Sequence, residues 1–123
     1  MNSENIIADQ NIDVLGIGYV YSYLGREGYI VFEVNTDPNH HFQLLAKKED
    51  DFILVAVRTA YHPTFGTIDK AIQDKLIEES ERLNAIPHFA SLAVTPLETV
   101  DLAIDGLTGG KEYKVAFNGI TIV

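Results

Sequence analysis

The stretch that decides the fold class runs from Phe42 to Thr59 and has the sequence FQLLAKKEDDFILVAVRT. Two apolar segments, residues 42–46 and 52–58, flank the polar run from Lys47 to Asp51, which predicts two strands joined by a tight turn. The second segment, FILVAVR, shows no alternation of apolar and polar residues. A strand of this kind is central in its sheet and covered on both sides. We therefore expect a helix on each face.

Helices and further strands are predicted on either side of this pair. Apolar residues at helical spacing predict one helix over residues 5–24 and a second over residues 68–83. β-Branched and aromatic residues predict strands over residues 29–34 and 89–94. The order is therefore α-β-β-β-α-β, an α/β fold in which helices flank a mixed sheet.

Two more elements are predicted after this core. Residues 95–98, TPLE, match a capping box with proline at the first helical position. They predict a short helix to about Ile104, although residues 100–107 also fit a strand. Residues 111–117 alternate as a half-buried strand does, and Asn118-Gly119 then predicts the turn of a terminal β-hairpin.

Length and composition narrow the class of protein. A chain of 123 residues fits a single domain over residues 1–123. The sequence has no cysteine, which excludes disulfides and thiolate zinc sites and fits a reducing compartment. The N-terminal residues lack the basic and apolar regions of a secretory signal, and no apolar run approaches the ~18 residues of a membrane span. We expect a cytoplasmic protein without membrane contact.

The charge of the chain argues against a polyanionic ligand. The formal net charge is −9, and the nine basic residues are scattered. The adjacent pair Lys47-Lys48 is followed at once by Glu49-Asp50-Asp51. Because proteins that bind phosphate backbones usually carry a basic stripe, nucleic-acid binding is disfavoured, though acidic nucleases that bind DNA through a metal keep it open.

The element order and the hairpin resemble the common core of the PD-(D/E)xK nuclease superfamily, the restriction endonuclease-like fold, over residues 5–94. In that family the second strand carries an Asp, the third strand carries Glu-x-Lys, and a helical crossover follows. On this pattern Gln43 occupies the Asp position, and Ala56-Val57-Arg58 occupies the Glu-x-Lys positions. The resemblance therefore implies the family's fold with a degenerate active site.

The substituted residues remove the chemistry that the resemblance would otherwise imply. The family's two carboxylates would hold Mg²⁺, a hard cation that prefers oxygen ligands and activates water. Gln43 offers a neutral amide oxygen, Ala56 offers no ligand atom, and Arg58 is a poor substitute for a lysine that positions water. The helix-one glutamate of the family could correspond to Asp13 or Glu4. We expect no cofactor, and Mg²⁺ only if the site is rearranged.

Several residues are candidates for ligand binding, each with a plainer alternative. Gln43, Ala56 and Arg58 are expected to share one face, where they could still bind a ligand or an anion. Alternatively, Arg58 is a polar strand end paired with an acid. Glu33 lies in the apolar segment YIVFEV, and it is either a paired or edge carboxylate or a displaced metal ligand.

Histidine and tyrosine side chains provide the remaining candidates. His62 lies in the aromatic loop YHPTFG and could contact a ligand, or the loop could fold back on the core. His40 and His41 are expected to point to opposite sides, so no histidine metal site is predicted. The first predicted helix carries Tyr19, Tyr21 and Tyr23, which cannot all face one way. They form either a dimer patch or a set of tyrosines with hydroxyls at the core edge.

Three hypotheses follow from the sequence. The preferred one is a non-catalytic nuclease-like protein that binds a partner, as a homodimer or with another protein. The second is a metal-dependent nuclease with a rearranged site built from Glu33, Asp13 and Arg58. The third is an unrelated α/β interaction protein, since a fold alone does not fix function.

Overall fold

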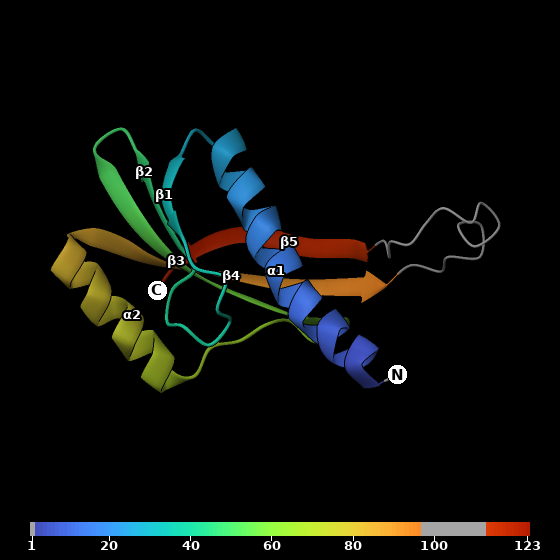
Figure 1. Cartoon of the computed structure of the whole chain (residues 1–123). Helices are drawn as coiled ribbons and strands as arrows, with labels where there is room; N and C mark the ends of the chain where they lie inside the picture. Colours follow the sequence, from blue (N-terminus) through green and yellow to red (C-terminus); the bar gives the residue numbers. More distant parts are fainter. Residues whose placement is uncertain (1, 97–112) are drawn as a thin grey trace.

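The computed structural model describes residues 2–96 and 113–123, with side chains from Ile12 onward, and in it five strands form one sheet that packs against two helices (Figure 1). The elements are α1 (Asn2–Arg26), β1 (Ile30–Val34), β2 (Leu44–Lys48), β3 (Asp51–Tyr61), α2 (Lys70–Leu83), β4 (Ala85–Pro96) and β5 (Tyr113–Ile122). The α-β-β-β-α-β order is confirmed, and with it an α/β fold in which helices flank a mixed sheet.

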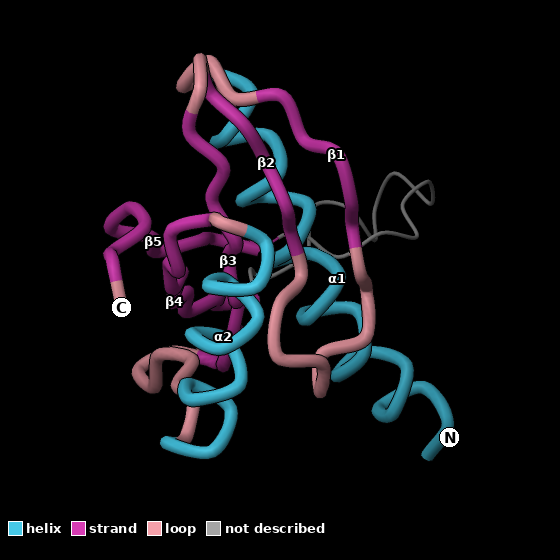
Figure 2. The backbone as a smooth tube through the Cα atoms, turned by 90° about the vertical axis from the view of Figure 1, so that its left-hand side faces the viewer, coloured by secondary structure: helices cyan, strands magenta, loops and turns pink. Residues whose placement is uncertain are grey.

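The strands lie in sequence order across the sheet, with β3 in the centre. β2 is antiparallel to both β1 and β3, β3 and β4 run parallel, and β5 is antiparallel to β4. A parallel pair needs a crossover that returns along the sheet, and α2 supplies it (Figure 2). The Asp69 carboxylate caps α2 by accepting the Ile72 N–H at 2.8 Å, and Asn84 ends the helix in the left-handed conformation at φ 56°.

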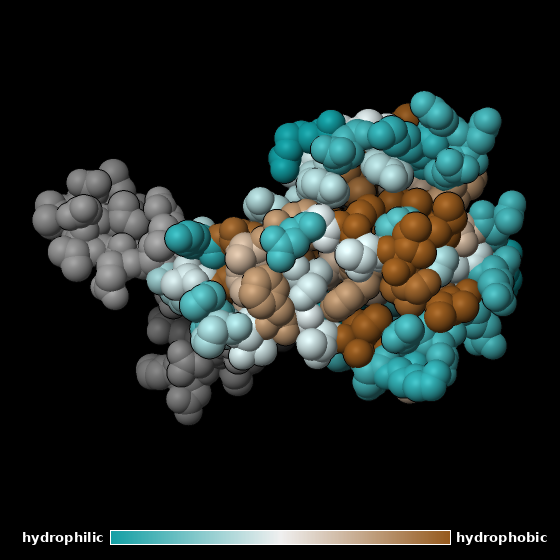
Figure 3. Space-filling view, turned by 180° about the vertical axis from the view of Figure 1, so that it is seen from behind, coloured by the Kyte–Doolittle hydropathy of each residue, from teal (hydrophilic) through white to brown (hydrophobic). Residues whose placement is uncertain are grey.

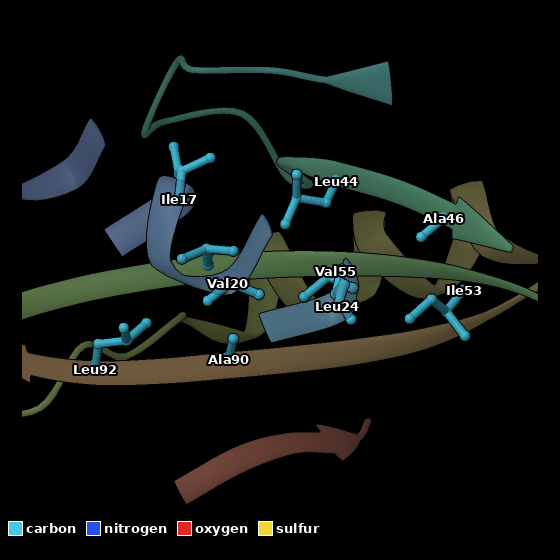
Figure 4. Packing of buried hydrophobic residues seen from close by; sticks show 10 residues of the cluster. Ile17, Val20, Leu24, Leu44, Ala46, Ile53, Val55, Ala90 and Leu92 are labelled. Carbon is cyan, nitrogen blue, oxygen red and sulfur yellow. The ribbon is translucent and has the colours of Figure 1, made fainter. Parts of the chain in front are cut away.

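β3 is buried on both faces, as the absence of alternation in FILVAVR predicts. Its side chains alternate between two apolar clusters. Toward α1, residues Ile53, Val55 and Val57 pack with Val20 and Leu24 (Figure 4). Toward α2, residues Leu54 and Ala56 pack with Phe42 and Leu76. One helix on each face therefore accounts for the burial of the central strand.

The tyrosines of α1 divide as the helical geometry requires. Tyr19 and Tyr23 pack edge-on against Phe117 of β5, with ring centroids 5.6 and 5.0 Å apart. Tyr21 points away from the sheet and is 49% exposed. Two tyrosines therefore complete the core edge, and one adds to the apolar surface.

The C-terminal part of the predicted fold was wrong. Residues 113–122 form one continuous strand and no hairpin. Ala90 pairs with Ile120 and Leu92 pairs with Phe117, so Asn118-Gly119 together oppose the single residue between Ala90 and Leu92. Gly119 has φ 94°, and the Asn-Gly pair therefore forms a β-bulge in place of a turn.

The predicted helix start at Thr95 was also wrong. Thr95 and Pro96 end β4, where they pair with Lys114 and Tyr113 of β5. Cross-strand pairing here overrides the local capping signal. The rest of the predicted helix, to about Ile104, and the alternative strand over residues 100–107 lie outside the described residues.

Contact between α1 and β3 depends on the absence of a side chain at one position. A methyl group on Gly16 would overlap the Thr59 Oγ1, whereas a methyl group on Gly18 would meet no atom within 4 Å. We expect Gly16→Ala to lower the free energy of unfolding by about 1–3 kcal/mol through overpacking. Gly18→Ala should raise it by up to about 1 kcal/mol through helix propensity. Urea denaturation of both variants tests this, and equal stabilities would contradict it.

His88 of β4 makes stability depend on pH. Its side chain is 8% exposed and its Nδ1 lies 3.1 Å from the Ile86 carbonyl oxygen. Burial lowers the pKa of His88 below 6.5, and the Ile86 hydrogen bond opposes that shift. As the pH falls, the unfolded chain therefore binds the proton before the folded chain does. The stability from neutral His88 is fully present above about pH 6.5 and is lost as the pH drops from there toward the lowered pKa of the folded state.

We expect this loss to have a slope of at most about 1.4 kcal/mol per pH unit for one proton. Urea denaturation between pH 8 and pH 5 should show a shallower pH dependence for His88→Gln than for the original chain. His62→Gln, at an exposed position, is the control and should follow the original chain. An unchanged slope in His88→Gln would show that another group carries the dependence.

Candidate functional site

Gln43 lies directly before β2, at the point where the loop from β1 reaches the sheet. Its backbone N–H donates to the Val55 carbonyl at 2.8 Å, and its carbonyl accepts from the Asn35 N–H at 2.7 Å. Leu44 pairs with Val55, which places Gln43 beside Ala56 of β3. The Gln43 side chain is fully buried. A buried amide of this kind must satisfy its hydrogen bonds within the protein.

All the hydrogen-bonding capacity of the Gln43 amide is used. Its Nε2 donates to the carbonyl oxygens of Asp37 and His40 at 3.0 and 2.9 Å. Its Oε1 accepts from the Val57 N–H at 2.7 Å and from Arg58 Nη1 at 3.0 Å. An amide offers two donor hydrogens and two acceptor lone pairs. The side chain therefore joins the loop to β3 and leaves no lone pair for a metal.

Arg58 reinforces the same junction. Its Nη1 also donates to the Val57 carbonyl, and its Nη2 donates to the His40 carbonyl, both at 3.0 Å. Burial lowers the pKa of Arg58 below its ordinary value, and three carboxylates oppose that shift, in the order Asp13, Asp69 and Asp37. Arginine nevertheless stays charged in proteins. The site therefore holds one cation whose N–H groups are directed at backbone carbonyls.

Ala56 contributes only packing. It is fully buried in the α2-side cluster with Leu54 and Leu76. The predicted grouping of Gln43 and Arg58 is present as a direct contact, with Ala56 beside Gln43. Gln43 and Arg58 with their backbone partners therefore form a hydrogen-bonded clamp, and Ala56 adds a buried methyl group beside it.

The other predicted residues divide between two places. Asp13 on α1 lies close enough to Arg58 to raise the pKa of its guanidinium. Glu33 is exposed on β1, in the sheet's outer strand, and lines a separate pocket with the side chains of His40 and His41. Asp13, Glu33 and Arg58 are therefore not brought together.

The histidines also differ from expectation. His62 is exposed after β3, with its backbone N–H donating to the Val94 carbonyl at 2.8 Å. Within residues 12–96 and 113–123, no hydrogen bond or ion pair joins its side chain to Arg58. The expectation that His40 and His41 point apart was wrong, because the loop is not extended and their rings stack with centroids 4.3 Å apart. Among these same residues, no group of three or more His, Asp or Glu side chains could hold a metal ion.

The sequence does not reveal several members of the site. The carbonyl groups of Asp37 and His40 carry no signal in the residue pattern, because any residue provides a carbonyl. Gly66 packs so closely on Arg58 that a methyl group there would overlap the Arg58 backbone. Only this glycine, at the end of the loop after β3, carries a residue-type signal that could have indicated the close approach.

Comparison with known proteins gives the following matches. A family model described as a domain of unknown function, DUF8840, matches residues 10–123. No curated protein matches the chain. Among solved structures, the chain is similar to Hjc, a Holliday junction resolvase from the archaeal hyperthermophile Archaeoglobus fulgidus, at 12% identity and a TM-score of 0.47. That similarity covers 58% of this chain and 59% of the resolvase chain, less than two thirds of its length. No helix in the described ranges is long and apolar enough to cross a membrane.

The clamp predicts a large cost for removing the Gln43 amide. Gln43→Ala would leave two carbonyls, one backbone N–H and Arg58 short of a partner, and we expect a loss of about 2–4 kcal/mol in the free energy of unfolding. Gln73→Ala on α2 is the matched control and should change stability by no more than about 0.5 kcal/mol. Urea denaturation measures both, and a Gln43→Ala variant as stable as the control would contradict the clamp.

Proposed function

We propose a function for this chain, which belongs to the DUF8840 family of domains of unknown function. It is a non-catalytic protein of nuclease-like fold that acts by binding a protein partner. That partner is a second copy of the chain or another protein. The proposal has two parts, the loss of metal-dependent chemistry and the use of an exposed surface.

The observation that carries the first part is the saturated amide of Gln43. Mg²⁺ needs oxygen ligands with free lone pairs, and the Gln43 Oε1 already accepts from Val57 and Arg58. Ala56 has no ligand atom and lies in the core. A water-activating metal would have to displace hydrogen bonds that hold the loop to β3, which supports a structural role for these residues.

Arg58 supports the same conclusion. A cation that stabilises a scissile phosphate must present free N–H groups to it. Three of the five N–H groups of the Arg58 guanidinium donate to the His40 and Val57 carbonyls and to Gln43. Its charge is further offset by neighbouring carboxylates, with Asp13 the strongest of them. The negative charge of these carboxylates disfavours a phosphate beside Arg58.

Exposed apolar side chains support the second part. Ile30 and Phe32 of β1 are 66% and 57% exposed, and Tyr21 of α1 is 49% exposed. Figure 3 shows hydrophobic side chains gathered on another face as well, between hydrophilic side chains above and below. Apolar surface of this kind is typical of protein contact sites. The net charge of −9 disfavours a polyanion as the partner.

The alternative of a metal-dependent nuclease with a rearranged site has less support. It requires Asp13, Glu33 and Arg58 to act together. The carboxylates that influence Arg58 are those of Asp13, Asp69 and Asp37, and Glu33 is not among them.

We expect the purified chain to leave duplex DNA, branched DNA and single-stranded RNA uncut in millimolar Mg²⁺ or Mn²⁺. A metal at a hundredfold its Kd would add roughly 2.7 kcal/mol of stability, whereas we expect no rise in Tm. Cleavage by the original chain that is lost in both Arg58→Ala and Asp13→Asn would overturn the proposal. Cleavage that persists unchanged in both variants would indicate a contaminant.

A further inference from the structure

A pocket of about 300 Å³ lies where β1, the loop before β2 and α2 meet. Its apolar lining comes from Phe42, Leu45 and Leu83. Its polar lining includes the carboxylates of Glu33 and Glu79, the guanidinium of Arg82 and two imidazoles. The pocket adjoins the clamp, because His40 lines the pocket and its carbonyl accepts hydrogen bonds from Gln43 and Arg58.

One carboxylate in the pocket has no counter-ion. Arg82 forms an ion pair with Glu79. Burial, and after it the neighbouring His40, lowers the pKa of His41 below its ordinary value, against the opposing effect of Glu79, so His41 is neutral at pH 7. Among the described side chains, none forms a hydrogen bond or ion pair with Glu33. Of the two carboxylates that line the pocket, Glu79 is therefore paired with Arg82 and Glu33 has no ion-pair partner among the described side chains.

A β-bulge directs Glu33 into this pocket. Val31 pairs with Ala46 and packs against the α1-side cluster. In a regular strand Glu33 would share that face, because side chains alternate. The register instead shifts between Val31 and Glu33, and Glu33 pairs with Leu45, which packs on the α2-side cluster. Bulges often re-aim a side chain next to a functional site.

The remaining walls suit an aliphatic chain that ends in a cation. The stacked rings of His40 and His41 meet Phe42 edge-on, with centroids 4.9 and 5.5 Å from it. Aromatic faces attract cations, and the methylene groups of arginine or lysine cover apolar surface while the charged end finds a carboxylate. The floor of Leu45 and Leu83 provides that apolar surface.

The same face continues along an open sheet edge. β1 is one of the two edge strands of the described sheet, so its second backbone edge faces no strand among residues 2–96 and 113–123. Phe32 is exposed and rests edge-on against Phe52, with centroids 5.7 Å apart, and Ile30 is exposed beside it. An extended segment can add to such an edge through backbone hydrogen bonds, while its side chains enter adjacent pockets.

We propose that the pocket around Glu33 binds an arginine or lysine side chain of a protein partner whose extended backbone lies along β1. The inference rests on the proposed function, since it names the chemistry of the partner that a non-catalytic binding protein would take. The charge complementarity is the expected one, because the chain as a whole is strongly acidic.

The test is an NMR titration of the full ¹⁵N-labelled chain with the peptide acetyl-Thr-Val-Arg-Val-Thr-amide, alongside the same peptide with neutral citrulline in place of arginine. We expect saturable shifts at the amides of residues 30–34, Leu45 and Leu83 with the arginine peptide. The citrulline peptide should bind at least tenfold more weakly. Glu33→Gln should weaken arginine-peptide binding at least fivefold, whereas Glu78→Gln, the same charge change at an exposed α2 position, should leave it unchanged.

Several results would overturn the inference. Equal binding of the two peptides, no effect of Glu33→Gln, or no binding at all would remove the cation pocket. Binding of acetyl-arginine-amide as tight as that of the peptide, with no β1 shifts, would contradict the strand-like partner. A response to Zn²⁺ alone at His40 and His41 would assign the pocket to a metal. A cleavage assay on the same sample decides the proposed function independently, so the two failures are distinguishable.

Discussion

The buried amide of Gln43 is the interaction on which the rest of the site depends. A glutamine without water must satisfy two donors and two acceptors internally, and here the partners come from the loop, from β3 and from Arg58. The His40 carbonyl accepts from both Gln43 and Arg58. These two hydrogen bonds hold His40 in place, and His40 also lines the neighbouring pocket. The Gln43 amide and the Arg58 guanidinium therefore constrain the shape of the loop.

Two irregularities at the outer strands adapt a regular sheet to particular contacts. In β1, the extra residue between Val31 and Glu33 moves Glu33 to the α2 side. In β5, the extra residue at Asn118-Gly119 lets one strand pair with β4 from His88 to Pro96. The central strand has no such irregularity in its pairing with β2 and β4. Bulges at sheet edges commonly have this role, and here the central strand provides rigidity while an edge strand carries the exposed groups.

The sequence predicts burial and regular strand pairing, and it misses the irregularities in pairing and in the loops. FILVAVR identifies the central strand because a strand covered on both faces has no polar alternation. The contact between Gln43 and Arg58 follows from the register of that strand with β2. The bulge at Asn118-Gly119 was missed because the same dipeptide serves turns and bulges. The orientation of Glu33 was missed because YIVFEV contains no sign of a register shift, and the stacking of His40 on His41 depends on a loop held by backbone carbonyls.

The central claim is that the Gln43 amide is bound within the protein and cannot act as a metal ligand. The most direct measurement is an NMR titration of the labelled chain with Mn²⁺, which broadens signals of nearby nuclei. The account predicts that the side-chain amide of Gln43 and the backbone amide of Val57 are not selectively broadened at millimolar Mn²⁺. Selective, saturable broadening of those two signals together with that of Asp13 would contradict it and would place a metal beside Gln43.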